Sequence, residues 1–391
     1  MSRENTTTTL RPSTRGERLG FSEIVKIRNE VLAMTAAGKH IIRLEGGEPF
    51  PPTPDFVKDA IKRSVDENRT RYAPSSGIAP LLEAIVAKLA RRNAIQTDES
   101  RIIVVNGGAH GLFCSFQATL DEGDEALFLA PYWTPIRDLV AFAGGKAILL
   151  SWDDALGEGP AAAIEKRITS KTRLLYLNSP SNPTGNVLGR SDLEAIARLA
   201  VERDLVVISD EAYEDLLYEE PHVSIASLPG MGERTLTVFT LSKSYSLTGV
   251  RVGYVVAPEP FMTVIRKLVL NSTNGVSTPA QYGALAALSD RSGYLDGMRD
   301  EYRLRRDLLL KAVNGAGFKC KAPRGAFYLL PDVTERLGGD SWGAMKALLE
   351  ATGIASVPGA VFGREGEGRL RMSFSTSLDV LEEASEALRR F

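Results

Sequence analysis

Residues 205–213 read LVVISDEAY, an apolar run that ends in a carboxylate. The apolar part, 205–209, carries no polar face, and this pattern is typical of a strand covered by helices on both sides. Six more runs of this texture lie at 102–105, 126–129, 147–150, 174–177, 235–240 and 252–256. Helical stretches separate many of them, for example 111–120, 134–143, 190–203 and 258–269. This alternation predicts an α/β fold with a mostly parallel seven-stranded sheet between helices.

The two ends of the chain have a different texture. We expect residues 1–15 to form a mobile tail, followed by a helix over 20–37 and a short strand at 41–44. A long charged helix over 290–316 begins the C-terminal part, and its basic residues Arg303, Arg305 and Arg306 are expected on a solvated face. Shorter apolar segments at 318–321 and 326–331 and helices at 341–352 and 378–391 follow. We therefore expect a large cofactor-binding domain over 46–289 and a smaller α+β domain formed by 16–45 and 290–391.

Composition excludes several classes of protein. The 391 residues include 43% hydrophobic and 25% charged residues and carry a net charge of −2, so neither a nucleic-acid partner nor a membrane partner is expected. No apolar run reaches the roughly 18 residues that a membrane helix needs. Cys114 and Cys320 form no CxxC pair and HExxH is absent, so we expect packing cysteines and no metal site. The chain starts without a signal-peptide pattern, which favours a cytoplasmic protein.

Two loops are candidates for ligand binding. The segment 105–111, VNGGAHG, follows a strand and opens a helix, where small residues let backbone N–H groups approach a phosphate. It is equally compatible with a tight strand–helix turn, and neither GxGxxG nor a P-loop occurs in the chain. The segment 178–185, NSPSNPTG, forms a rigid loop at a strand end, where parallel sheets bind ligands. Taken alone, it could also be a simple turn.

Three charged residues have sequence neighbours that are unusual for a charged side chain. Asp210 closes an apolar strand three residues before Tyr213, although such an aspartate can also be a helix N-cap. Lys243 lies among serine, threonine and tyrosine residues, which suits a lysine that must be neutral for part of its cycle. Arg371 alternates with apolar residues on a predicted strand, and an inward-pointing arginine needs an anion from the protein or from a ligand.

Taken together and in order, these features resemble one family. The chain resembles the fold-type I pyridoxal-phosphate enzymes of the class I/II aminotransferases, nearest to the bacterial aspartate aminotransferase-like branch, from about residue 20 to the C-terminus. The matching motifs are GEP at 47–49, RYAP at 71–74, PYW at 131–133, NPTG at 182–185, SDExY at 209–213, SK at 242–243, GVR at 249–251, GAFY at 325–328 and RMSF at 371–374.

The resemblance implies roles around a pyridoxal 5'-phosphate ring. Lys243 would form the Schiff base with the cofactor and move the proton during catalysis, and Asp210 would keep the pyridine nitrogen protonated. Asn182 and Tyr213 would bond the phenolic oxygen, and Trp133 would stack on the ring. By the same resemblance, the cofactor phosphate would contact the backbone of Gly108, Ala109 and His110, the side chains of Thr240 and Arg251, and Tyr72 of a neighbouring subunit. A homodimer with shared active sites is therefore implied.

The resemblance also implies where substrates bind. Arg371 would clamp the substrate α-carboxylate, with Gly47, Trp133 and Asn182 beside it. Acidic-substrate members of the branch carry a lysine where this chain has Ala109, so a non-acidic amino donor is expected. The implied function is transfer of an amino group from an L-amino acid to a 2-oxo acid by a ping-pong mechanism. A lyase or other quinonoid chemistry on the same fold, a non-enzymatic regulator and an unrelated nucleotide-binding enzyme are the alternatives.

Overall fold

The structure is a computed structural model that describes residues 10–17 and 19–391. The tail predicted for residues 1–15 lies outside the described residues as far as residue 9, and residues 14–17 form helix α1. The helices are α1 (Thr14–Glu17), α2 (Glu23–Ala36), α3 (Asp55–Asp66), α4 (Ala79–Lys88), α5 (Gly108–Thr119), α6 (Pro135–Phe142), α7 (Trp152–Glu158), α8 (Pro160–Glu165), α9 (Arg190–Glu202), α10 (Phe261–Ser272), α11 (Thr278–Ser289), α12 (Tyr294–Gly315), α13 (Thr334–Leu337), α14 (Ser341–Thr352) and α15 (Leu378–Arg390). The strands are β1 (Ile42–Arg43), β2 (Ile102–Val105), β3 (Glu125–Ala130), β4 (Lys146–Ser151), β5 (Thr172–Asn178), β6 (Val206–Asp210), β7 (Thr235–Thr240), β8 (Gly253–Val256), β9 (Tyr328–Leu329), β10 (Ile354–Ala355), β11 (Val357–Pro358) and β12 (Leu370–Ser373).

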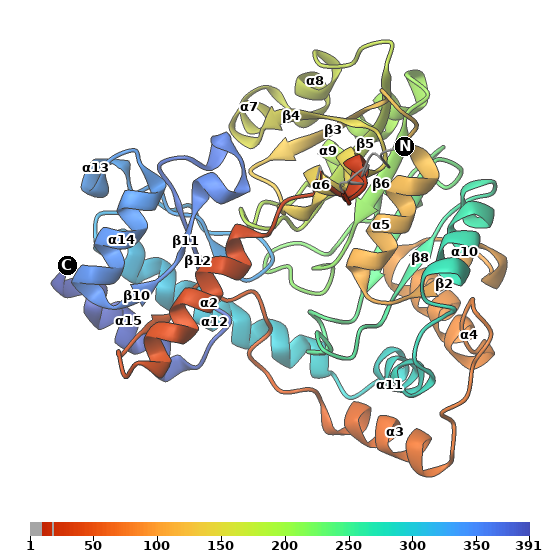
Figure 1. Cartoon of the computed structure of the whole chain (residues 1–391), viewed down its shortest axis with the longest axis horizontal. Helices are drawn as coiled ribbons and strands as arrows, with labels where there is room; N and C mark the ends of the chain where they lie inside the picture. Colours follow the sequence, from red (N-terminus) through yellow and green to blue (C-terminus); the bar gives the residue numbers. More distant parts are fainter. Residues whose placement is uncertain (1–9, 18) are drawn as a thin grey trace, which may run out of the picture.

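A seven-stranded sheet forms the centre of the molecule, in the order β2-β8-β7-β6-β5-β3-β4 (Figure 1). Strand β8 runs antiparallel to both of its neighbours, and the other neighbouring pairs are parallel. All seven apolar runs of the sequence are strands of this sheet, so the predicted fold class is confirmed. The sequence did not reveal that the last of these runs reverses direction.

Helices cover both faces of the sheet, as the two-sided apolarity of its strands requires. On one face α5, α6 and α10 pack against side chains such as Ile103 and Val105, whereas the alternate residues Ile102 and Val104 face α4 and α11. Helices α7, α8 and α9 continue that second layer over β3, β5 and β6. The carboxyl edge of the parallel strands remains free for a site.

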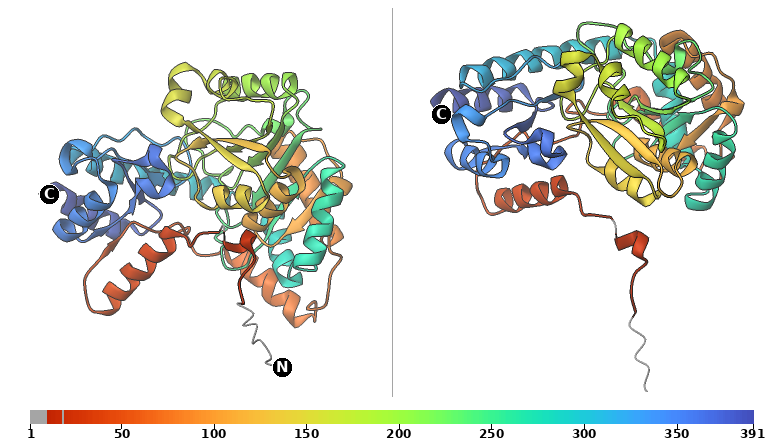
Figure 2. Two further views of the ribbon diagram at one scale, coloured as in Figure 1. Left: turned by 45° about the horizontal axis from the view of Figure 1, so that its top comes forward. Right: turned by 90° about the horizontal axis from the view of Figure 1, so that it is seen from above.

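A smaller α+β part of the molecule lies beside the central sheet (Figure 2). Helices α12 and α15 pack together over the small antiparallel sheet β11-β12-β9, and their apolar side chains form one buried cluster. Strand β1 pairs in parallel with β10, and the backbone N–H of Ser373 donates to the carbonyl of Leu44 at 2.7 Å. The N-terminal segment is thereby joined to the C-terminal strands, and residues 45–47 lie next to β12.

The expectation of a solvated basic face on α12 was wrong for two of its three arginines. Arg305 and Arg306 are each only 7% exposed. Arg305 donates to the carbonyl of Thr376 and to Glu301, and Arg306 donates to Glu219, Asp307 and the carbonyl of Pro323. The sequence could not reveal these partners because most of them come from distant segments. Among the helices of the described residues, none is long and apolar enough to cross a membrane.

Candidate active site

The candidate site forms where the parallel strands end. Asp210 closes β6 and lies in register with Asn178 at the end of β5. Thr240 closes β7, and Lys243 follows it after a sharp turn. The buried loop residue Asn182 follows β5. Side chains from three separate segments of the sequence therefore converge on one edge of the sheet.

Lys243 points across this edge toward the N-terminal segment. Its Nζ donates to the carbonyl of Gly47 at 2.8 Å and lies 6.0 and 5.8 Å from the ring centroids of Tyr213 and Phe327. A Cβ on residue 47 would lie 3.2 Å from the Tyr328 hydroxyl, so only glycine fits there without displacement. The amine is held by a backbone carbonyl and aromatic rings, and no carboxylate of residues 10–17 and 19–391 forms an ion pair with it.

Burial and nearby charges lower the proton affinity of this amine. Burial is the largest cause that lowers the pKa of Lys243; Glu48 and Asp210 raise it, and the positive charges of Arg371 and Arg251 lower it. Together these effects bring the pKa from 10.5 to about 8. Lys243 can therefore exchange a proton near physiological pH, as a general acid–base group must.

Asp210 is 6% exposed and has two hydrogen-bond donors in the chain. The hydroxyl of Tyr176 donates to Oδ2 at 2.8 Å, and the backbone N–H of Ala212 donates to Oδ1 at 3.2 Å. Burial raises the pKa of Asp210 to about 6, and the two donors oppose the shift. Tyr176 was missed from the sequence because its place inside an apolar strand is that of a core residue.

Arg371 is a fully buried cation at the far side of the site, 2% exposed. It donates to Oδ1 of Asn182 at 3.3 Å and to the carbonyl of Glu45 at 2.8 Å, and its guanidinium carbon lies 4.5 Å from the ring centroid of Tyr328. Its Nε has no partner among the described residues. Since a buried guanidinium needs an anion, this arrangement fits a ligand carboxylate.

Tyr328 joins the two halves of the site. Its hydroxyl lies 3.0 Å from that of Tyr213, and burial raises the pKa of both phenols. The sequence contained a signal for it, because GAFY at 325–328 matched the family, but no role was assigned to the tyrosine.

The start of α5 forms a cradle with Arg251. Gly107 has φ +80°, and a Cβ there would lie 2.5 Å from a guanidinium nitrogen of Arg251. Both acceptors found for Arg251 are backbone carbonyls, of Thr248 at 2.8 Å and of Asn106 at 3.4 Å. An arginine that contacts only carbonyls beside a helix N-terminus fits a bound phosphate.

The first turn of α5 offers its N–H groups unequally. The N–H of His110 donates to the carbonyl of Gly107 at 3.2 Å, whereas no acceptor is found among the described residues for Gly108 and Ala109. The His110 ring accepts from the N–H of Asn106 and contacts the Ser272 hydroxyl at 3.0 Å, and burial lowers its pKa. His110 therefore anchors the turn to α10.

The remaining predicted residues lie around this centre. Thr240 contacts the Ser242 hydroxyl at 3.0 Å, and its Cβ would lie 3.3 Å from a Cβ on Gly108. Trp133 is partly buried against the α5–α6 layer, and Ala109 is exposed. Tyr72 is 90% exposed, and no hydrogen bond or ring contact to the cluster is found for it within the described chain.

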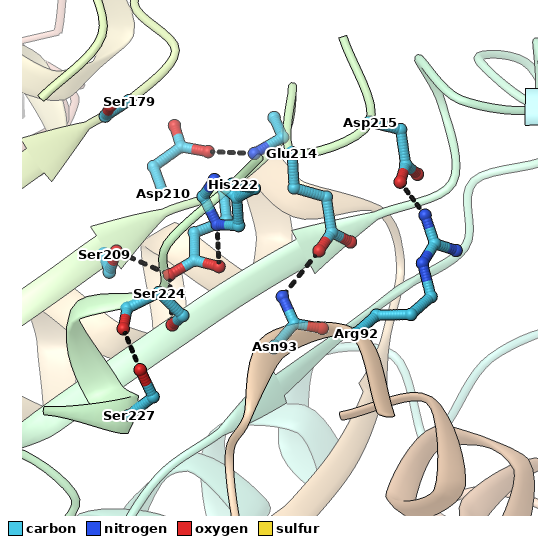
Figure 3. A network of polar contacts seen from close by, with 12 residues as sticks. Arg92, Asn93, Ser179, Ser209, Asp210, Glu214, Asp215, His222, Ser224 and Ser227 are labelled. Atoms are coloured by element: carbon cyan, nitrogen blue, oxygen red, sulfur yellow. Dashed lines mark hydrogen bonds and ion pairs between the residues drawn. The ribbon is translucent and has the colours of Figure 1, made fainter. Parts of the chain in front are cut away.

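Behind the site lies a second group of buried acidic side chains that have hydrogen-bond partners, part of which is drawn in Figure 3. Glu211 accepts from Ser209, Ser224 and His222. Glu214 accepts from Lys88 at 2.5 Å and from Asn93 at 2.7 Å, and Asp215 accepts from Arg92. Glu211, Glu214 and His222 lie close enough to one another to hold a metal ion, but the Lys88 ammonium already neutralises Glu214.

Comparisons with known proteins agree with this geometry. The family model described as aminotransferase class I and II matches residues 39–388. The aspartate/prephenate aminotransferase of Thermus thermophilus is 39% identical over 375 residues, which is 94% of this chain and 95% of that protein. A solved structure of Thermus thermophilus aspartate aminotransferase with maleate has a TM-score of 0.92 at 38% identity, covering 97% of this chain and 100% of that one. The aromatic aminotransferase of Pyrococcus horikoshii has a TM-score of 0.87 at 38% identity, covering 93% and 97%.

These matches extend over almost the whole chain and include both the central sheet with its helices and the smaller α+β part. The activity implied by the sequence motifs, amino-group transfer between an amino acid and a 2-oxo acid, is therefore confirmed. The chain is an enzyme and belongs to the class I and II aminotransferases.

Proposed function

We propose that this aminotransferase uses pyridoxal 5'-phosphate bound at Lys243 and takes a non-acidic L-amino acid as amino donor. The observation that carries the proposal is the buried guanidinium of Arg371, which has no ion-pair partner among the described residues and acts electrostatically on the low-pKa amine of Lys243. A carboxylate at Arg371 would bring the Cα of an amino acid toward Nζ.

The surrounding residues fit such a cofactor. When bound, pyridoxal phosphate supplies an electron sink for the bond that breaks at Cα. Asp210 would hold the ring nitrogen in its charged form, Asn182 and Tyr213 would donate to the ring oxygen, and Trp133 would cover one ring face. Arg251, Thr240, Gly108, Ala109 and His110 would hold the phosphate, the last through a backbone N–H that must first leave the carbonyl of Gly107.

The chain's own groups then carry out the transfer. Arg371 binds the α-carboxylate as a two-pronged donor, and Asn182 and Gly47 limit how the substrate can rotate. Lys243, once neutral, would take the proton from the substrate Cα and return it to the cofactor carbon on the other side of the amino nitrogen. Its lowered pKa keeps a useful share of the amine neutral near pH 7 to 8. The same binding set serves the 2-oxo acid, which also has a carboxylate for Arg371.

The preference for a non-acidic donor rests on the charge around the opening. Ala109 is exposed and offers no cation for a distal carboxylate. Glu48 adds a negative charge that acts electrostatically on Lys243, and the guanidinium of Arg28, 4.0 Å away, offsets part of that charge. Among the relatives, the names include both aspartate and aromatic aminotransferases. The overall fold is therefore compatible with either class of substrate.

An amino-acid panel tests this proposal. The purified protein loaded with pyridoxal phosphate is mixed with single amino acids, and the change of the cofactor absorption is recorded before any 2-oxo acid is added. Neutral or aromatic amino acids should change the spectrum fastest. A response to aspartate alone would contradict the proposed donor, and ammonia release without a 2-oxo acid would indicate lyase chemistry.

We also propose a homodimer in which Tyr72 reaches the partner's phosphate. The support is its 90% exposure, which leaves the phenol free to reach a second chain. Mixing two inactive chains tests it: Lys243→Ala and Tyr72→Ala homodimers should regain activity when mixed, because half of the sites in mixed dimers are then intact. Failure to regain activity would contradict shared sites.

The domain division and the location of the protein remain proposals. We propose that residues 46–289 form the cofactor-binding domain and that 16–45 and 290–391 form the smaller one, in line with the separate apolar clusters. The two unpaired cysteines, Cys114 and Cys320, favour a reducing compartment such as the cytoplasm.

A further inference from the structure

One buried tyrosine contacts the catalytic carboxylate from inside the sheet. The Tyr176 hydroxyl donates to Oδ2 of Asp210 at 2.8 Å, and both residues are almost fully buried, at 2% and 6% exposure. The tyrosine comes from β5 and the aspartate from β6, and these strands are hydrogen-bonded neighbours. The contact therefore joins two rigid elements, and no water is needed to complete it.

The ring of Tyr176 has little freedom to move. It packs between Phe116 of α5 and Phe128 of β3, with centroid distances of 5.8 and 6.1 Å. The carboxylate of Asp210 has only one other donor within the described chain, the backbone N–H of Ala212 on Oδ1. The Tyr176 hydroxyl, which donates to the Asp210 carboxylate, is thus fixed by packing before any ligand binds.

We propose that Tyr176 is a positioning residue for Asp210: its hydroxyl keeps this carboxylate charged and aimed at the cofactor ring nitrogen. This inference rests on the proposed use of pyridoxal phosphate. In a buried site of low dielectric constant, a hydrogen bond to a carboxylate stabilises its charged form more than in solution. Asp210 then accepts the hydrogen bond from a protonated ring nitrogen and does not take the proton itself.

Another buried tyrosine supplies a matched control. Tyr254 lies in the same sheet, on β8, with its ring stacked 4.9 Å from Phe239. Its hydroxyl is buried and has no partner among the described residues. Tyr176→Phe and Tyr254→Phe each remove one buried hydroxyl from a central strand, and only the first removes a bond to Asp210.

The protonation of the ring nitrogen is the direct measurement. Wild type and the two variants are loaded with pyridoxal phosphate carrying 15N in the ring, and the nitrogen resonance reports its protonated fraction. We expect the ratio of protonated to unprotonated nitrogen to fall about tenfold in Tyr176→Phe, because a hydrogen bond to a charged group is lost. Tyr254→Phe should match wild type. Equal nitrogen resonances in wild type and Tyr176→Phe would overturn the proposal.

A second variant tests the proposal even if Tyr176→Phe does not fold. Replacement of Tyr176 by 3-fluorotyrosine keeps the hydroxyl and makes it a stronger donor, so the protonated fraction should rise above that of wild type. A fall or no change would contradict the positioning role. Failure of the proposed function has a different signature: wild type itself would then bind no pyridoxal phosphate at Lys243.

Discussion

The segment 210–215 presents two faces that differ in how completely their charges are paired. On the front face, Asp210 and Tyr213 contact neutral donors. Within the described chain, the hydrogen bonds of the nearby Arg371 go only to carbonyl and amide oxygens. On the back face, Glu214 and Asp215 are paired with cations from the end of α4 and the π-helical turn that follows it.

Both faces are buried, so burial does not separate function from structure. Burial alone would raise the pKa of Glu214, but the positive charges of Lys88 and Arg92 together lower it. For Asp210 no cation overcomes burial, and its pKa stays raised, at about 6. The front face, where Asp210 has no cation strong enough to offset burial, is therefore the face expected to bind a ligand. The back face, where Glu214 is paired with cations, is expected to stabilise the fold.

The two buried lysines should give the largest contrast in activity. Lys243→Met should lower turnover by at least about 10²–10⁴-fold, because the group that moves the proton is gone, while the fold is kept. Lys88→Met should leave turnover within a fewfold of wild type. Steady-state kinetics and thermal unfolding of both variants check this pair. Comparable turnover losses in the two would contradict the distinction between the faces.

Arg371 and Arg92 should also differ, because the first is expected to affect activity and the second stability. Arg371→Leu should lower kcat/KM by roughly 30- to several-thousand-fold, since the substrate carboxylate loses a buried partner worth about 2–5 kcal/mol. Its stability in urea should be unchanged or higher, because a buried cation without an anion is removed. Arg92→Leu should do the opposite and destabilise the protein by leaving Asp215 unpaired. A strongly destabilised Arg371→Leu would show that this arginine is a structural group.

The back face should show its effect in stability. Lys88→Met leaves Glu214 buried without its cation and should lower the free energy of unfolding by about 3–5 kcal/mol. The double variant Lys88→Met/Glu214→Leu should recover most of this loss, because no charge is then left unpaired. Urea denaturation of wild type, the single variants and the double variant gives the coupling. Additive losses would argue against a coupled pair.

A smaller effect is expected at the cradle. Gly107→Ala places a Cβ against Arg251 at a backbone φ of +80°, so affinity for pyridoxal phosphate should fall, by on the order of tenfold. Gly123→Ala is the control, because its φ is +93° and a Cβ there meets nothing within 4 Å. Titration with pyridoxal phosphate measures the affinity of both variants. Equal affinities would contradict a phosphate site at Gly107 and Arg251.

The smallest expected effect is a shift in pH dependence. Without cofactor, the rate at which a neutral electrophile labels Lys243 should rise through a midpoint near pH 8, well below the ordinary 10.5. Arg371→Leu removes a positive charge and should raise the midpoint, whereas Asp210→Asn removes a negative charge and should lower it. Mass spectrometry of the labelled peptide follows the rate, and shifts of the opposite sign would contradict the electrostatic account.

The sequence predicted the central sheet well and its surroundings less well. Strand β6 could be located because every residue of it is buried on both faces, and the same holds for β2 and β3. Helices α4 and α11 were not predicted, since they lie between other elements and show weak one-sided periodicity. Arg306 was misjudged because its partner Glu219 lies 87 residues away in sequence.

The site was predictable wherever a motif carried it. Asp210 and Arg371 are charged residues in otherwise apolar strands, and Lys243 lies among hydroxyl-bearing residues, so apolar packing does not explain any of the three. Tyr176 had no such signal, because a tyrosine between leucines on a strand is indistinguishable from a core residue until the neighbouring strand is known. Register between strands, which short-range patterns do not encode, places its hydroxyl on Asp210.

The most direct test of the account compares the two buried lysines chemically. The protein is incubated with pyridoxal phosphate, the covalent bond to the amine is fixed with borohydride, and the labelled peptide is identified by mass spectrometry. The account predicts one label per chain, on Lys243, since its amine has no carboxylate bound to it, and none on Lys88, which is paired with Glu214. A label on Lys88, or no label on either lysine, would contradict it.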